Sequence, residues 1–191
     1  MNRSPWLKPN SAIEGVTWPA IPDPKSALVL AVIQQLEESQ WWSPQDLLEH
    51  QMWQLEAVLA HAAAHCPFHR ERLAAIGYGA GPVPTMEMLR KLPIMTRRDL
   101  QTRHAEIRAA QVPRDHGRVA ESKTSGSTGE PVVIAGTDLV DFFVRAFNLR
   151  NHRWHRLDLM GKLCLIKPFD PGTAEPPDGT AYADWDVAAY P

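Results

Sequence analysis

The chain has 191 residues, with 20 Lys and Arg against 22 Asp and Glu, and 44% of its residues are hydrophobic. This length fits one ordinary domain and allows the chain to bury a core. A formal net charge of −2, with no basic patch or tail, argues against a protein whose main task is to bind nucleic acid or acidic lipid. Two cysteines outside any CxxC pattern, Cys66 and Cys164, exclude a disulfide scaffold and a four-cysteine zinc site. They favour a reducing cytoplasmic location.

Residues 1–42 are expected to form an extended, proline-rich leader and one helix. Prolines recur through the first 25 residues without apolar periodicity. The longest apolar run, Ala27–Ile33, is too short to span a bilayer, and no small-residue cleavage site follows it. The run therefore predicts a core helix rather than a membrane span or a signal peptide.

Residues 43–117 are predicted to form a helical scaffold. Ser43, Pro44 and Asp46 supply an N-cap, a proline at the first helical position and an acid at N3. An apolar stripe follows at helical spacing and ends at Pro67, which predicts a helix of about six turns. A shorter helix is expected over His69–Ile76, and further ones are expected after two threonine caps. The residues of the stripe are Leu48, Met52, Leu55, Leu59, Ala62 and Cys66, and the caps are Thr85 and Thr96.

Residues 118–191 show a different pattern, which predicts an α/β arrangement. Arg118–Thr124 and Val132–Ala135 favour extended structure, and Asp138 is expected to open a helix. Leu163–Ile166 is predicted to be a buried strand. The buried side of the helix is expected to carry Leu139, Phe142, Phe143, Ala146, Phe147 and Leu149.

The segment Thr124–Pro131, with the sequence TSGSTGEP, carries the densest functional signal. Glycines allow backbone N–H groups to converge on phosphate oxygens, and Ser and Thr hydroxyls add donors that can also reach a bound metal. Lys123 adjoins the segment as a nearby cation. No Gly-Lys-Ser/Thr follows, which disfavours a P-loop NTPase. A solvent-exposed Ser/Gly hairpin turn is the alternative interpretation.

The octapeptide resembles the phosphate-binding signature of the adenylate-forming enzymes, the acyl-CoA synthetase and luciferase superfamily. Two further segments are similar to the phenylacetate–CoA ligase branch of that superfamily. His61–Leu73 is similar to its "HA…PFYRERL" segment, and Leu92–Leu100 to its "LP…TK.DL" stretch. The resemblance covers roughly Ser43 to Ile166, with the three motifs in the expected order.

The resemblance implies an N-terminal helical scaffold that leads into the first strands and helix of an adenylation domain. It implies a reaction in which a small-molecule carboxylate attacks ATP, with Mg²⁺, to form an acyl-adenylate. Coenzyme A then takes the acyl group. Hydroxyls and backbone amides of the loop would hold the phosphates and stabilise the charge on the leaving pyrophosphate. The residues implied to bind the ATP phosphates are Thr124, Ser125, Gly126, Ser127, Thr128, Gly129 and Glu130.

The family's acyl pocket, adenine-binding loop, acidic metal-binding motif, ribose-binding Asp and C-terminal lysine cannot be placed in this sequence. We therefore expect the chain to be the first part of such an enzyme, inactive alone, with catalytic residues unknown. A non-catalytic nucleotide-binding module or a relic fragment is one alternative. An adenylating enzyme of capsule or cofactor biosynthesis is another, and a homodimer remains open.

Four other groups of residues have a functional and a structural interpretation. His61 and His65 share a helix face with Cys66 and His69 nearby, but a helix surface with a buried thiol is favoured over zinc. Ser125 lacks a GxSxG context, so it is not expected to be a nucleophile. Four arginines recur at near-helical spacing and are interpreted as a solvated helix face: Arg145, Arg150, Arg153 and Arg156. The tryptophans Trp41, Trp42 and Trp53 are interpreted as packing anchors.

Overall fold

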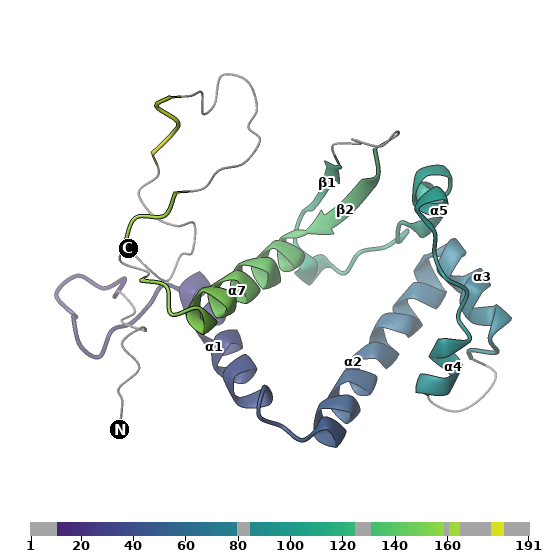
Figure 1. Ribbon diagram of the computed structural model, residues 1–191, viewed down its shortest axis with the longest axis horizontal. Coiled ribbons are helices and arrows are strands. Elements are labelled where there is room, and N and C mark those ends of the chain that lie inside the picture. Colours follow the sequence, from purple (N-terminus) through teal and green to yellow (C-terminus); the bar gives the residue numbers. More distant parts are fainter. Residues whose placement is uncertain (1–10, 80–84, 125–130, 159–160, 165–176, 182–191) are drawn as a thin grey trace. The chain divides into compact units, whose positions relative to one another are not determined.

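The computed structural model describes residues 11–79, 85–124, 131–158, 161–164 and 177–181 (Figure 1). The fold is mixed α/β and mostly helical, with a small two-stranded antiparallel sheet. None of the described helices is long and apolar enough to cross a membrane. The elements are α1 (Pro24–Ser39), α2 (Pro44–His65), α3 (Pro67–Ala75), α4 (Met86–Arg90), α5 (Arg97–Thr102), α6 (His104–Ile107), the 3₁₀ turn η1 (Arg114–His116), β1 (Val119–Lys123), β2 (Val133–Thr137) and α7 (Asp138–Trp154).

The chain divides into two compact units. One consists of Met1–Gln40 with Phe142–Pro191, and the other of Trp41–Asp141. These units follow different bounds from the three segments 1–42, 43–117 and 118–191 that the sequence suggests.

In the first unit, α1 and α7 share a small hydrophobic core. Val29 and Ile33 of α1 are buried with Ala146 and Leu149 of α7. Burial of a Val, Ile or Leu side chain such as Val29, Ile33 or Leu149 stabilises the folded state by about 1.5–3 kcal/mol. The predicted core helix over Ala27–Ile33 is therefore confirmed, and it begins at Pro24 behind the N-cap Asp23.

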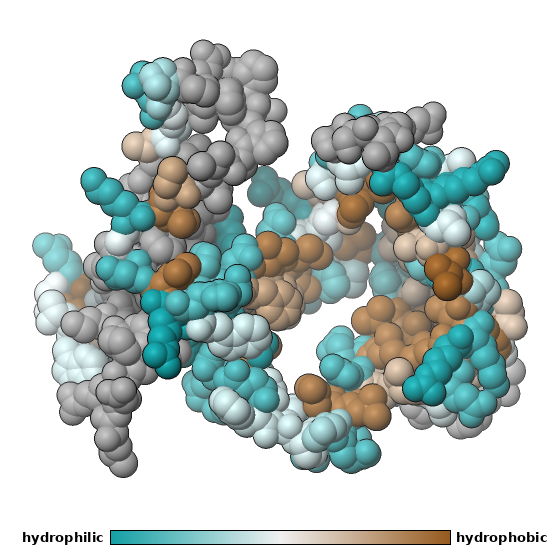
Figure 2. Space-filling model, in the orientation of Figure 1, coloured by the Kyte–Doolittle hydropathy of each residue, from teal (hydrophilic) through white to brown (hydrophobic). Residues whose placement is uncertain are grey.

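Only one face of α7 is buried in this unit. Phe142, Ala146 and Leu149 pack toward α1, whereas Phe143 is 39% exposed and Phe147 is 50% exposed. The prediction that both exposed phenylalanines are buried is wrong. The reason is geometric, because they lie about 100° around the helix from the positions that meet α1. Figure 2 shows hydrophobic side chains at the surface over α7.

The second unit is built on α2 and α3. The predicted cap is confirmed, because Ser43 Oγ accepts a hydrogen bond from the Asp46 N–H (3.1 Å), and α2 ends immediately before Cys66 and Pro67. Along the predicted stripe only Leu59 and Cys66 are buried, and Leu48 is exposed. Proline 67 turns the chain back as α3, and α3 therefore covers only the C-terminal part of α2.

Short helices complete this unit through local caps and one ionic cluster. Thr96 and Asp99 form a full capping box at the start of α5, and Thr85 caps α4, as predicted. The Arg103 guanidinium contacts Glu71 (2.8 Å) and Glu106 (2.6 Å), and it lies over the buried Phe68 ring at 4.7 Å. Arg103 thereby ties α3 to α6.

Two further predictions do not agree with the structure. Leu163 and Cys164 are exposed and form no strand, whereas Leu165 and Ile166 lie outside the described residues. Trp41 and Trp53 are 83% and 76% exposed, so they are not packing anchors. Trp41 lies before the start of α2, and Trp53 lies on a solvent-exposed side of that helix.

Candidate functional site

The predicted phosphate loop connects β1 and β2. The two strands pair antiparallel with Val119 opposite Thr137 and Lys123 opposite Val133. Of the predicted binding residues, Thr124 is described, whereas Ser125, Gly126, Ser127, Thr128, Gly129 and Glu130 lie outside the described residues. The described structure therefore shows how the loop is held at its two ends.

Thr124 and Val132 close the base of the loop with two hydrogen bonds. The Thr124 N–H donates to the Val132 carbonyl oxygen (3.0 Å), and the Val132 N–H donates to Thr124 Oγ1 (3.0 Å). Val132 is buried, with 4% of its surface exposed. Since a hydroxyl oxygen that accepts one bond still has its own hydrogen, Thr124 can donate to an anion while it holds Val132.

Lys123 provides a positive charge beside the base of the loop. It is the last residue of β1 and is exposed, and no described side chain forms an ion pair with it. All five residues of β1 are exposed, and both strands are edges of a two-stranded sheet. The hairpin therefore presents Lys123 and Thr124, at the start of the loop, toward solvent.

The opposite end of the hairpin is fixed by Asp138, the first residue of α7. Asp138 Oδ2 accepts a hydrogen bond from the Arg118 N–H (2.8 Å), and the Asp138 N–H donates to the Arg118 carbonyl oxygen (3.1 Å). Gly117 precedes this contact with a positive φ of 78°. The sequence pattern predicts Asp138 at the start of the helix, but no local pattern signals its contact with Arg118, just before β1.

The cluster around His61, His65 and Cys66 does not form a metal site within the described residues. The rings of His61 and His65 lie 4.6 Å apart, as their spacing predicts. Cys66 is buried, and burial raises the pKa of its thiol. Within the described ranges, no group of three or more His, Cys, Asp and Glu side chains is placed to hold a metal ion.

The arginines of α7 are only partly a solvated face. The Arg153 side chain is 8% exposed and lies 3.7 Å from Glu37 of α1, and Arg150 lies over the Trp154 ring at 4.3 Å. Trp154 in turn donates from Nε1 to the Gln40 side chain (3.2 Å). The contacts of Arg153 and Trp154 hold α7 to α1, whereas Arg145 and Arg156 are exposed, as expected for a solvated face.

Compared with known proteins, the chain matches no family model and no curated protein.

Proposed function

We propose that this chain forms the phosphate-binding part of an ATP-dependent carboxylate-activating enzyme. The reaction is acyl- or aryl-adenylate formation followed by transfer to coenzyme A. The proposal follows the resemblance of residues 124–131 to the adenylate-forming signature and of residues 61–73 and 92–100 to the phenylacetate–CoA ligase branch.

The observation that carries the proposal is the closed base of the loop. Thr124 and Val132 exchange two hydrogen bonds across it, so the segment between them starts and ends at fixed points. A loop with fixed ends loses less conformational entropy when it orders around a ligand. A solvent-exposed Ser/Gly hairpin turn without a ligand does not need its ends to be held by a threonine hydroxyl and a buried valine.

The donor chemistry of the described residues fits a polyphosphate. The Lys123 ammonium and the Thr124 hydroxyl hydrogen are both donors, and an ammonium beside hydroxyl and amide donors is suited to a phosphate. Bound ATP with Mg²⁺ supplies the adenylyl group and the pyrophosphate that leaves. The residues of the chain would bind and orient those phosphates, and no catalytic base or acid is assigned.

The test uses the full chain and thermal unfolding with Mg²⁺–ATP or pyrophosphate. A ligand at about 100 times its Kd stabilises the folded state by about 2.7 kcal/mol, which raises Tm. Ser127→Ala combined with Thr128→Ala should remove this shift. The matched control Ser122→Ala lies on the exposed strand β1, outside the loop, and should retain the shift.

Two outcomes would contradict the proposal. The first is the absence of any shift with either ligand, which would favour a relic fragment. The second is an equal shift in the double variant and in Ser122→Ala, which would place the nucleotide elsewhere.

A further inference from the structure

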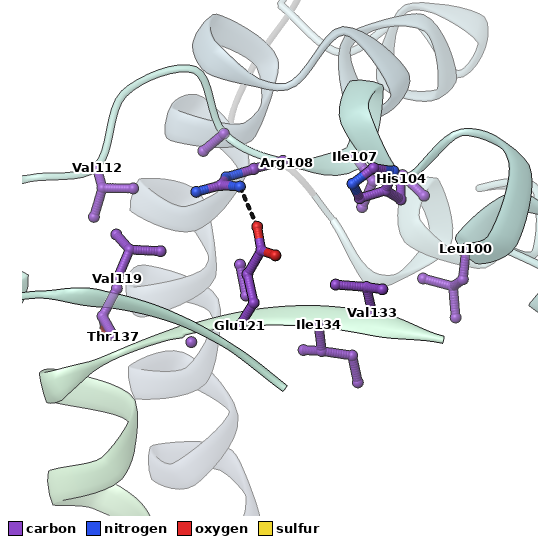
Figure 3. Close-up of a pocket in the computed structure, with 13 residues that line it drawn as sticks. Leu100, His104, Ile107, Arg108, Val112, Val119, Glu121, Val133, Ile134 and Thr137 are labelled. Atoms are coloured by element: carbon purple, nitrogen blue, oxygen red, sulfur yellow. Dashed lines mark hydrogen bonds and ion pairs between the residues drawn. The ribbon is translucent and has the colours of Figure 1, made fainter. Parts of the chain in front are cut away.

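A cavity of about 230 Å³ lies between the β1–β2 hairpin and the chain that runs from α5 past α6 (Figure 3). Its walls are mostly apolar. Its described lining residues all belong to the unit Trp41–Asp141. The apolar walls include Leu100, Ile107 and Val112 on the helical side and Val119, Val133 and Ala135 on the hairpin.

One face of the hairpin forms most of the floor of the cavity, and Ile134 and Gly136, at the alternate positions of β2, also line it. The cross-strand partners Val119 with Thr137 and Glu121 with Ala135 project from the same face, because paired residues share a face of the sheet. Ala120 lies on the opposite face, opposite Gly136. This alternation allows a substitution on the floor to be matched by one on the other face.

A single ion pair crosses the cavity from wall to floor. Arg108 Nη1 lies 2.5 Å from Glu121 Oε1, and Figure 3 shows the two side chains meeting between the apolar groups. Both side chains are about half exposed, and within the described part of the chain neither has another side-chain partner. Arg108 therefore keeps unused N–H donors, and Glu121 keeps a second carboxylate oxygen as an acceptor.

The charge balance and the size of the cavity define its ligand. Besides the imidazole of His104, the ionisable side chains in the described lining are Arg108 and Glu121. A carboxylate ligand would meet Glu121, and an ammonium ligand would meet Arg108, so an uncharged ligand is favoured. Apolar cavities of about 150 Å³ in proteins hold benzene. A cavity of about 230 Å³ therefore accommodates one ring with a small substituent.

We infer that this cavity is a binding site for a small uncharged single-ring compound that carries one hydroxyl group. The ring lies against Leu100, Ile107 and Val133, and the hydroxyl donates to the Glu121 carboxylate and accepts from the Arg108 guanidinium. Neither Lys123 nor Thr124 lines this site, and its binding does not depend on the proposed nucleotide chemistry. Because the hairpin is its floor, an occupied cavity holds the hairpin against the chain around α6.

Phenol is the probe for the test, because it is a neutral single-ring hydroxyl compound at neutral pH. Titration into the full chain is followed by NMR shifts of the methyl groups of Val133 and Ile107. We expect saturable shifts with a Kd on the order of 1 mM, typical of so small a ligand. Ala135→Leu fills the floor and should weaken binding by about tenfold or more, since it replaces ligand volume with side chain. Ala120→Leu makes the same change on the other face and should leave binding unchanged.

A second variant tests the role of the ion pair, and its result does not depend on whether the chain still folds with Ala135→Leu. Glu121→Gln leaves the positive charge of Arg108 uncompensated. Benzoate, which should bind the unaltered chain more weakly than phenol, should then bind about tenfold more tightly than before. Absence of saturable phenol shifts, equal effects of Ala135→Leu and Ala120→Leu, or a phenol-to-benzoate preference unchanged by Glu121→Gln would each overturn the inference.

Discussion

Asp138 joins the start of α7 to the backbone of Arg118 just before β1. Its Oδ2 accepts the Arg118 N–H at 2.8 Å, its own N–H donates to the Arg118 carbonyl at 3.1 Å, and its Oδ1 lies 3.5 Å from the Arg118 guanidinium. Thr124 and Val132 make a comparable pair of bonds at the other end of the strands. The hairpin that carries the candidate loop is thus held at both ends by a side chain bonded to backbone.

Gly117→Ala should destabilise the end of the hairpin at Asp138. Gly117 has a φ of +78°, and an added Cβ would lie 2.5 Å from Asp138 Oδ2 and 2.7 Å from Asp138 Cβ. A side chain there is strained by the backbone and collides with the capping carboxylate. We expect the free energy of unfolding to fall by about 1–3 kcal/mol, measured by urea denaturation.

Gly136→Ala is the matched control for this change. Gly136 lies in β2, and an added Cβ would meet no atom within 4 Å. Its effect should stay within about 0.5 kcal/mol, as for an ordinary surface substitution. Equal losses in the two variants would show that the contact between residues 117 and 138 does not hold the hairpin.

Thr124→Val should loosen the base of the candidate loop. Valine has nearly the same shape but provides no acceptor for the Val132 N–H, whose bond to Thr124 Oγ1 is 3.0 Å. Loss of such a bond costs about 1 kcal/mol. The Val132 amide hydrogen should therefore exchange roughly fivefold faster by NMR. Thr124→Ser retains the hydroxyl and should keep the slow exchange; if valine and serine exchange alike, the hydroxyl does not anchor the loop.

The sequence predicted those features that depend on residues close together in the chain. Ser43 with Asp46 and Thr96 with Asp99 cap their helices within one turn, and Pro67 ends α2 for reasons internal to its own ring. The hairpin was predicted because two segments that favour extended structure flank a glycine-rich loop. Local chemistry fixes such features before any tertiary contact forms.

Features that depend on contacts between elements could not be predicted in the same way. The bond from Arg103 to Glu71 joins α3 to the chain before α6, and the ion pair of Arg108 with Glu121 joins two elements that no motif relates. The prediction of which α7 side chains are buried was also wrong in part. The sequence pattern indicates an apolar helix but does not show which face α1 covers. For the candidate loop, the bonds between Thr124 and Val132 show how its two ends are held.

Alkylation should distinguish the two cysteines. Cys66 is buried, and this burial, which outweighs the opposing effect of Arg70, raises its pKa and lowers the fraction of reactive thiolate. Cys164 is exposed. Iodoacetamide at neutral pH, followed by peptide mass spectrometry, should label Cys164 at least tenfold faster than Cys66. The difference should vanish in urea, and equal rates in the native chain would contradict the burial of Cys66.

The start of α5 should weaken in acid through one carboxylate. Hydrogen bonds from the Thr96 hydroxyl and N–H lower the pKa of Asp99 below its ordinary value, so the folded chain binds this proton less readily than the unfolded chain. The stabilisation is therefore complete above the ordinary pKa of an aspartate and is lost as the pH falls through the lowered value. The Thr96 amide hydrogen should lose protection over that acid range, after correction for intrinsic exchange. Asp99→Asn cannot titrate and should show no such step, whereas an identical step in the variant would assign the acid sensitivity to another group.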